Sequence, residues 1–398
     1  MVVRALINKN TLAHICETIG ITTEFIVART KYKSDQVGKW LDASDKALPT
    51  IKQAKCLSAC LHIPFAGLYM NPGDIPIKQL PNIKNMRTIQ GSIVYDDSAL
   101  NIAISDVLLG RNFLLESSSD FDVNIVPFSF SVPTKEEATI WADAIRKKMG
   151  IELQEQFNCN SNRKFYLYLR DKIEGKGIFV NCFTDVPVED VRGFAIYYTK
   201  LPIIGINDND SSPAKSFTLI HETVHLIKRS SSVCNEMVNS FTTLQEEVFC
   251  NAVAGELLVP KKALMDVLKK RCYVMPFSMK IIKSLANKFS VSKEVIVRRF
   301  LDLDLISHND YIKFYDTFRK EREEELKSRQ IAKEAGLNKP FLTNVAMDTF
   351  DRISPSISKI LFKGYIEDVY NKQDIARHLG IAQKYIDKYL EEVSKWNR

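Results

Sequence analysis

The sequence predicts an α+β protein that is predominantly helical, and three observations carry this prediction. Both ends of the chain place apolar residues at helical spacing, in segments joined by short turns. Near the middle, three short runs rich in Ile, Val, Phe and Tyr lie between turn residues, as in a small sheet. An apolar helical stretch with the pattern His-Glu-x-x-His follows them directly. We therefore expect helical bundles at both ends and a central core in which a small sheet precedes a helix.

The N-terminal segment predicts four short helices. The stretch "NTLAHICETIG" is expected to begin at a cap residue, Asn10 or Thr11. A second helix covers "TTEFIVART", a third opens at Ser34, and a fourth begins with Pro49 and the cap Thr50. Helices of this length, joined by turns of a few residues, are typical of a helix-turn-helix bundle.

In such a bundle, the helix within "DQVGKWLDAS" is the one that would enter a DNA groove, with Ser34, Gln36 and Lys39 as candidate contacts to DNA or to a partner. Residues 1–50 hold seven Lys or Arg against five Asp or Glu, which is a weak electrostatic footprint for DNA. The alternative is a bundle that recognises a protein or packs on the rest of the chain.

The rest of the chain divides by composition. The stretch Asn71–Asn85 holds three prolines and a glycine and predicts a linker. We expect a helix-turn-helix domain in residues 1–75, a linker and connecting segment in 76–135, the central core in 136–272 and a C-terminal helical domain in 273–398.

Within these segments, "PTKEEATIWADAIRKKMG" predicts a helix, and "GIFVNCF", "GFAIYYT" and "LPIIGIN" predict strands. Near the end, "FSVSKEVIVRRFLDLDLIS" and "DIARHLGIAQKYIDKYL" each predict a helix, a turn and a helix. The charged stretch "RKEREEELKSRQ" predicts a solvated helix face or a connecting helix.

Length and composition are those of a globular protein. The 398 residues, 45% hydrophobic and 26% charged, are enough for two or three cores. No run approaches the ~18 apolar residues of a membrane helix, and the start lacks the order of a signal peptide, so we expect a cytoplasmic protein without a membrane partner. A net charge of +7 permits an acidic partner without requiring one.

The eight cysteines form no Cys-x-x-Cys pair and lie mostly among apolar neighbours, so we expect reduced thiols. Cys56, Cys60 and His62 are an alternative set of metal ligands. The two cysteines lie four residues apart inside an apolar helical pattern, which favours a place in the core instead.

The stretch "SFTLIHETVHLIKR" carries the chemistry. His221 and His225 fall on one helical face and can direct their imidazoles to one point, which suits zinc. Glu222 then lies beside the metal, where it can take a proton from a water molecule. Two imidazoles and a carboxylate are costly to bury in an apolar helix unless something satisfies them, so we favour a metal over histidines hydrogen-bonded in a core.

A catalytic zinc of this type needs a third protein ligand. The apolar stretch "LQEEVFCNAVAGELLVP" offers Glu246, Glu247 and Glu256. Glu247 and Asn251 share one helical stripe, so a ligating Glu247 would have Asn251 one turn away to hydrogen-bond the site. Geometry favours Glu247 over Glu246 only modestly. One zinc per chain is expected, although the same ligands could hold manganese or iron.

These residues resemble the ImmA/IrrE-type zinc metallopeptidases, a bacterial and phage family. The resemblance lies in "RGFAIYY", "LPIIGIND", "FTLIHETVHLI" and "EEVFCNAVAGELLVP", in the family's order. The N-terminal stretch from "VGKWLDAS" to "IPFAGLYM" is similar to the Xre-type helix-turn-helix domain that some longer members carry, and "FSVSKEVIVRRFLDLDLIS" is similar to the segment that follows their peptidase core.

The resemblance implies a zincin-like peptidase core and a gluzincin-like metalloendopeptidase. It assigns His221, His225 and Glu247 as zinc ligands and Glu222 as general base. The implied substrate is a specific protein, a helix-turn-helix transcriptional repressor whose cleavage relieves repression. Tyr197, Tyr198 and Arg229 lie near the motif and are weak candidates for stabilising the oxyanion.

Two other classes of function fit the sequence. One is a DNA-binding regulator or antitoxin-like partner in which the zinc helix is structural or vestigial. It predicts sequence-specific, salt-dependent DNA binding through residues 34–44 and normal activity after Glu222→Gln. The other is a toxin or defence effector whose tightly restrained protease acts on host proteins.

Overall fold

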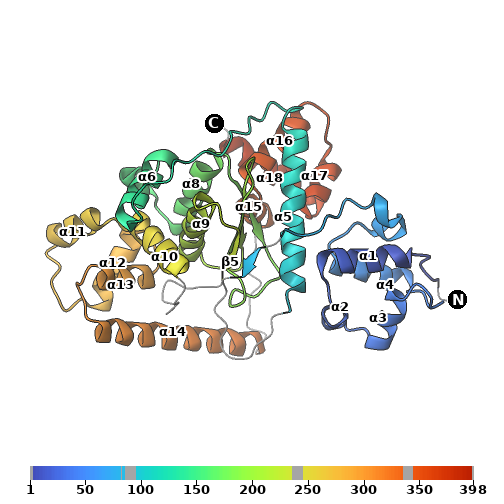
Figure 1. Ribbon diagram of the computed structural model, residues 1–398, viewed down its shortest axis with the longest axis horizontal. Helices are drawn as coiled ribbons and strands as arrows, with labels where there is room; N and C mark the ends of the chain where they lie inside the picture. The colour runs from blue at the N-terminus through green and yellow to red at the C-terminus, as the bar shows by residue number, and fades with distance from the viewer. Residues whose placement is uncertain (1–2, 82, 86–95, 235–244, 335–343, 397–398) are drawn as a thin grey trace.

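Figure 1 shows a computed structural model of the chain, which describes residues 3–81, 83–85, 96–234, 245–334 and 344–396. Most of these residues lie in helices, arranged around one small mixed sheet. The predicted class, α+β and predominantly helical, is therefore confirmed. The predicted domain boundaries stay a prediction.

The N-terminal bundle has the predicted helices, with one correction. The helices are α1 (Lys9–Ile19), α2 (Thr23–Thr30), α3 (Ser34–Leu41) and α4 (Ile51–Cys60), followed by the short 3₁₀ turns η1 (Phe65–Tyr69) and η2 (Pro72–Asp74). Thr50 caps α4 as predicted, in a capping box with Gln53. The prediction of Asn10 or Thr11 as the cap of α1 is wrong. The cap is Asn8, whose backbone is still extended and whose side chain accepts a hydrogen bond from the Thr11 amide.

Helix α5 (Ser98–Ser117) lies inside the segment predicted to be a linker. It contacts α1 on one side and β2 and α16 on others, and in Figure 1 it stands between the N-terminal bundle and the body. Among the described residues it is the one helix whose length and apolar composition would suffice to cross a membrane. Core helices of soluble proteins meet the same criteria, so these properties alone do not indicate a membrane span.

The sheet has the order β1-β5-β3-β4-β2. Its strands are β1 (Lys84–Asn85), β2 (Phe179–Phe183), β3 (Gly193–Ile196), β4 (Ile203–Asn207) and β5 (Ser232–Cys234). Strand β3 runs antiparallel to β4 and β5, while β2 pairs parallel with β4 and β1 parallel with β5. The three predicted strands are thus β2, β3 and β4.

Both faces of the sheet are covered, and alternate residues of β2, β3 and β4 enter different cores. Val180 and Ile204 point into a core with α8, α9, α10 and the helices that follow. Phe179 and Ile203 point into a second core with α5 and the C-terminal helices. A third core holds the N-terminal bundle together and includes Ile102 of α5.

The first core is surrounded by the helices α6 (Ala138–Met149), α7 (Leu153–Asn158), α8 (Asn162–Glu174), α9 (Ser212–Ile227), α10 (Gln245–Leu258), α11 (Lys261–Lys270), α12 (Met279–Phe289), α13 (Lys293–Asp302) and α14 (His308–Glu334). The predicted charged helix is part of α14, which runs along the lower edge of the body in Figure 1.

The second core holds the C-terminal helices α15 (Val345–Arg352), α16 (Pro355–Ile366), α17 (Lys372–Leu379) and α18 (Ile386–Trp396), with the 3₁₀ turn η3 (Gln383–Tyr385). Polar groups of α8 fix these helices against the body. Buried Arg170 donates to the carbonyls of Asp351 and Ile353, and Glu174 accepts hydrogen bonds from the amide and hydroxyl of Ser356. Burial raises the pKa of Glu174.

Candidate metal centre

Helix α9 carries the His-Glu-x-x-His motif through the middle of the first core. It packs against α8, α10 and strands β3 and β4, so every residue from Ser216 to Ile227 is buried. His221 is 3% exposed, and Glu222 and His225 are fully buried. Polar side chains buried this deeply are costly unless hydrogen bonds or a metal ion satisfy them.

Strand β3 comes unusually close to α9, and Gly193 allows it. A Cβ atom at Gly193 would lie 2.5 Å from the side chain of Thr218 and 3.4 Å from Glu222 Cγ. No larger residue fits there without a shift of the strand. The glycine belongs to the stretch "RGFAIYY", but no sequence pattern indicates its role.

Three side chains from α9 and α10 converge on one point. The Nε2 atoms of His221 and His225 lie 3.1 Å apart. Glu247 places Oε2 at 3.2 Å from His221 Nε2 and Oε1 at 3.1 Å from His225 Nε2. Within the described part of the chain this is the group of His, Cys and acidic residues whose ligand atoms could hold a metal ion.

This geometry fits a small divalent cation. Ligands at the ~2.0–2.1 Å typical of zinc, arranged tetrahedrally, lie about 3.3 Å from one another. The separations between the imidazole nitrogens and the carboxylate oxygens match that value. Two imidazoles and one carboxylate are also a common donor set for catalytic zinc, with a fourth position left for water.

The electrostatics agree with a cation-binding carboxylate. Burial alone would raise the pKa of Glu247, but hydrogen bonds and charge interactions with His221 and His225 outweigh it and lower that pKa strongly. Glu247 is therefore ionised in its buried place. Of the two candidates that the sequence left open, its carboxylate lies at the convergence point, whereas Glu246 lies on the other side of His225.

Glu246 and Ser230 hold the ring of His225 from behind. His225 Nδ1 lies 3.2 Å from Ser230 Oγ and 3.3 Å from Glu246 Oε1, and Ser230 Oγ donates to the same carboxylate at 2.9 Å. A partner at Nδ1 fixes the tautomer and leaves Nε2 free to ligate. The buried thiol of Cys250 lies 3.8 Å from the same nitrogen, and burial raises its pKa. These roles of Ser230, Glu246 and Cys250 were not predicted from the sequence.

Glu222 lies next to the convergence point without joining it. Ser232 of β5 donates a hydrogen bond to Oε2 at 3.2 Å. The other oxygen, Oε1, is buried and has no hydrogen-bond partner in the described residues. Burial is the main influence on this carboxyl and raises its pKa. An oxygen held in this way can accept a proton, which is the role that the sequence predicts for Glu222.

The remaining predicted residues lie as follows. Asn251 follows Glu247 by one turn of α10. The guanidinium carbon of Arg111 lies 4.0 Å from the centroid of the Tyr198 ring. The Tyr197 amide donates a hydrogen bond to Ser231 Oγ. Arg229 follows α9 with a left-handed backbone, φ 59°. These contacts are structural, and no oxyanion-stabilising role follows from them.

The predicted DNA or partner contacts and the alternative metal ligands both lie in the N-terminal bundle. On α3, Ser34 and Lys39 are exposed and Gln36 is half-buried. Cys60 is buried as expected for a core residue. His62 pairs with Asp106 of α5, so it has a partner other than a metal.

Comparison with known proteins agrees with the central region. Residues 174–301 match the model of the IrrE N-terminal-like domain, peptidase family M78. This match covers β2 to α13, including α9 and α10, and supports the ImmA/IrrE family for this region. It indicates a metallopeptidase-type domain and hence a metal. Searches of the curated proteins and of the solved structures found no match.

Proposed function

We propose that the protein is a zinc-dependent, gluzincin-like endopeptidase that hydrolyses a specific protein substrate. The observation that carries this proposal is the convergence of His221, His225 and Glu247 within about 3 Å of one another, with the Glu222 carboxylate beside them. The match to a peptidase domain over the same residues supports it independently.

Metal binding and proton transfer fall to different residues of the site. A zinc ion held by His221, His225 and Glu247 would polarise a peptide carbonyl and lower the pKa of a water molecule. Glu222 accepts a proton from the attacking water through Oε1, which has no hydrogen-bond partner among the described residues, and passes the proton to the leaving amine. Ser232 holds the other oxygen of Glu222 and thus orients the carboxylate for both transfers.

The substrate we propose is a helix-turn-helix transcriptional repressor. Its cleavage would relieve repression, as the resemblance to the ImmA/IrrE-type peptidases implies. The N-terminal bundle would bring the enzyme to its target through a protein or a DNA contact. Support comes from α3, which exposes Ser34 and Lys39 while Val37 and Trp40 anchor it in the bundle.

Metal content tests the proposal most directly. We expect one zinc per chain in the wild type by elemental analysis, a loss of it in Glu247→Ala, and full retention in Glu222→Gln. Glu24→Ala, which removes an exposed glutamate of α2, is the matched control and keeps both metal and activity. A wild type that takes up no metal after zinc supplementation contradicts the proposal.

Cleavage of a repressor encoded near the gene tests the substrate. The zinc-loaded wild type should cut it into two fragments, and Glu222→Gln should leave it whole. A repressor that stays intact with metal-loaded wild type contradicts this substrate without contradicting the peptidase.

DNA binding is a second candidate function for the bundle, because α3 presents Ser34 and Lys39 to solvent. Binding should weaken with salt, and Lys39→Ala should lower the slope by about one phosphate contact. A wild type that binds neither a repressor nor DNA through this helix removes both roles.

A further inference from the structure

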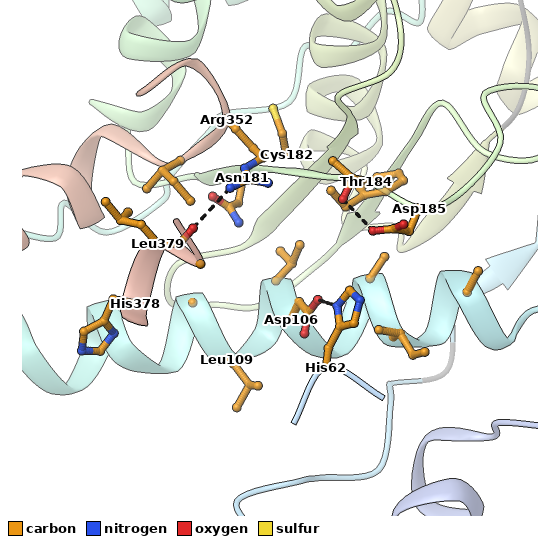
Figure 2. A pocket seen from close by; sticks show the side chains of 18 of the residues that line it. His62, Asp106, Leu109, Asn181, Cys182, Thr184, Asp185, Arg352, His378 and Leu379 are labelled. Atoms are coloured by element: carbon orange, nitrogen blue, oxygen red, sulfur yellow. Dashed lines mark hydrogen bonds and ion pairs between the residues drawn. The ribbon is translucent and has the colours of Figure 1, made fainter. Parts of the chain in front are cut away.

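A cavity of about 660 Å³ lies where four parts of the molecule meet (Figure 2). Its walls come from the N-terminal bundle, α5, the end of β2 and the C-terminal helices. None of the residues of the candidate metal centre lines it. Its volume lies within the range of roughly 300–1,000 Å³ that small-molecule sites occupy.

The carboxylates of the lining, Asp106 and Asp185, are paired with side chains of the N-terminal bundle. Arg29 of α2 forms an ion pair with Asp185, which follows β2. His62 Nδ1 lies 2.6 Å from Asp106 Oδ2 of α5, and Figure 2 shows the two side chains directed toward each other. Each acid of the lining thus has a cationic or titratable partner, so this side repels an anion only weakly.

The opposite wall offers hydrogen-bond donors that the described residues satisfy only in part. Arg352 donates one bond, from Nη2 to the Leu379 carbonyl at 3.3 Å, and forms no ion pair with any described carboxylate. Asn181 accepts from the Ser354 amide at 3.0 Å through Oδ1, while its Nδ2 has no acceptor among the described residues. Arg377 lies at the rim, 70% exposed, and reaches Asp374 only at 3.7 Å.

Much of the rest of the lining is apolar, although Thr184 and His378 also belong to it. Ile102 and Val107 of α5, Phe183 of β2 and Ile357 of α16 line it and are buried. A ligand that satisfies the donors would therefore place an apolar body against these side chains. In small-molecule sites, apolar walls commonly bury the ligand while a few polar groups orient it.

We propose that this cavity binds a small organic anion whose carboxylate or phosphate group faces Arg352 and the amide nitrogen of Asn181. Guanidinium and amide donors suit such groups because charge-assisted hydrogen bonds to them are strong and directional. The ligand would contact the bundle, α5 and the C-terminal helices at once, so its binding stabilises the docked position of the bundle. The proposal does not depend on peptidase activity.

Matched probes test the charge requirement on the full-length protein. The pairs are phenylacetate with phenylacetamide and phenyl phosphate with phenol, followed by ligand-observed NMR. We expect at least one anion to bind with a dissociation constant of about 1 mM or lower, and its neutral counterpart to bind at least about tenfold more weakly. The stronger of the two anions identifies carboxylate or phosphate as the preferred group.

Variants assign the binding to the cavity. Arg352→Gln should weaken the anion about tenfold, whereas Arg319→Gln, which removes an exposed arginine of α14, should leave it unchanged. Asn181→Asp keeps the acceptor for the Ser354 amide but replaces the free donors by a negative oxygen, and should weaken the anion even if Arg352→Gln does not fold. Circular dichroism melting checks folding.

Three results would overturn the proposal. They are no binding of either anion to the wild type, equal binding of anions and neutral counterparts, and wild-type affinity in folded Arg352→Gln or Asn181→Asp. The peptidase assay is unaffected by any of them, so the two proposals fail separately.

Discussion

The candidate metal centre and the cavity between the N-terminal bundle and the C-terminal helices are two sites with polar groups, and they are built in opposite ways. The metal centre takes its ligands from two neighbouring helices and brings His221, His225 and Glu247 to within about 3 Å of one another. The cavity takes its lining from the bundle, α5, β2 and the C-terminal helices, and its donors stay apart. One site converges on a single atom-sized point, while the other encloses a volume.

This difference teaches what each site can recognise. Buried groups that converge at ligand distance are costly unless a cation joins them, so the metal centre specifies an ion. The donors of the cavity face open space and can be hydrated when no ligand is present, so the cavity tolerates being empty. We therefore expect substitutions at the metal centre to have large effects and substitutions around the cavity to have small ones.

The largest effect is expected for Glu222→Gln. Loss of the proton acceptor should lower the rate of peptide hydrolysis by about 10²–10⁴-fold while the metal content stays at the wild-type value. Activity should be measured on the protein substrate, with zinc measured on the same sample. Ser232→Ala, which removes the hydrogen bond to Glu222 Oε2 and leaves the carboxylate in place, should give a smaller loss. A Glu222→Gln enzyme of normal activity would reject the assigned base.

The helix that carries Glu247 depends on a buried ion pair further along it. Glu256 of α10 pairs with Arg299 of α13, and the two side chains are 8% and 5% exposed. Glu256→Ala would leave the Arg299 charge buried, which typically costs about 3–5 kcal/mol of unfolding free energy. Asp302 lies 3.5 Å from Arg299 and offsets part of this loss, so we expect a value near the lower end, about 3 kcal/mol.

Urea unfolding of Glu256→Ala measures this cost. The matched control is Glu321→Ala, which breaks the exposed pair between Lys293 and Glu321 and should cost less than about 1 kcal/mol. Equal losses in the two variants would mean that burial of the Glu256 pair contributes nothing to holding α10.

A smaller effect is expected for Glu246→Gln. This change keeps a hydrogen-bond partner near His225 Nδ1 and Ser230 but removes the negative charge that favours the ligating tautomer. Metal affinity should fall by about 10–100-fold, measured by competition with a chelator. The control Glu24→Gln should change nothing. An affinity loss as large as that of Glu247→Ala would mean that Glu246 itself ligates the metal.

The same contrast explains how far the sequence could predict the two sites. His221, Glu222 and His225 lie within one helical turn and a half, and Glu247 lies in the next apolar helix that contains acidic residues, so the spacing carries the information. The hydrogen bonds of Ser230 and Ser232 depend on where the chain returns after α9, which no local pattern gives.

The cavity could not be predicted from the sequence, for a similar reason. The His62–Asp106 pair joins residues that are 44 positions apart in the sequence. The Arg29–Asp185 pair joins residues that are 156 positions apart. Helix α5, which forms one wall, escaped prediction because its apolar residues do not form one stripe. It contacts α1, α16 and β2 on different sides, and a helix buried on several sides loses the amphipathic period.

The smallest effect is expected at the bundle side of the cavity, where stability should depend on pH through His62. The hydrogen bond to Asp106 raises the pKa of His62 above its usual 6.5, with a further contribution from Asp185 and an opposing one from burial and Arg29. A folded-state pKa above the unfolded value means that the pair stabilises fully below about pH 6.5. This contribution is lost as the pH rises through the raised pKa.

Asp106→Asn removes the largest cause of the raised His62 pKa and should remove most of this pH dependence. The difference in melting temperature between wild type and variant is therefore expected to be largest near pH 6 and to shrink toward pH 8. Because the His62 and Asp106 side chains are 31% and 41% exposed, the pair should contribute no more than about 1 kcal/mol. Asp266→Asn, an exposed change on α11, should track the wild type at every pH. A difference that grows with pH would mean that another group titrates at this junction.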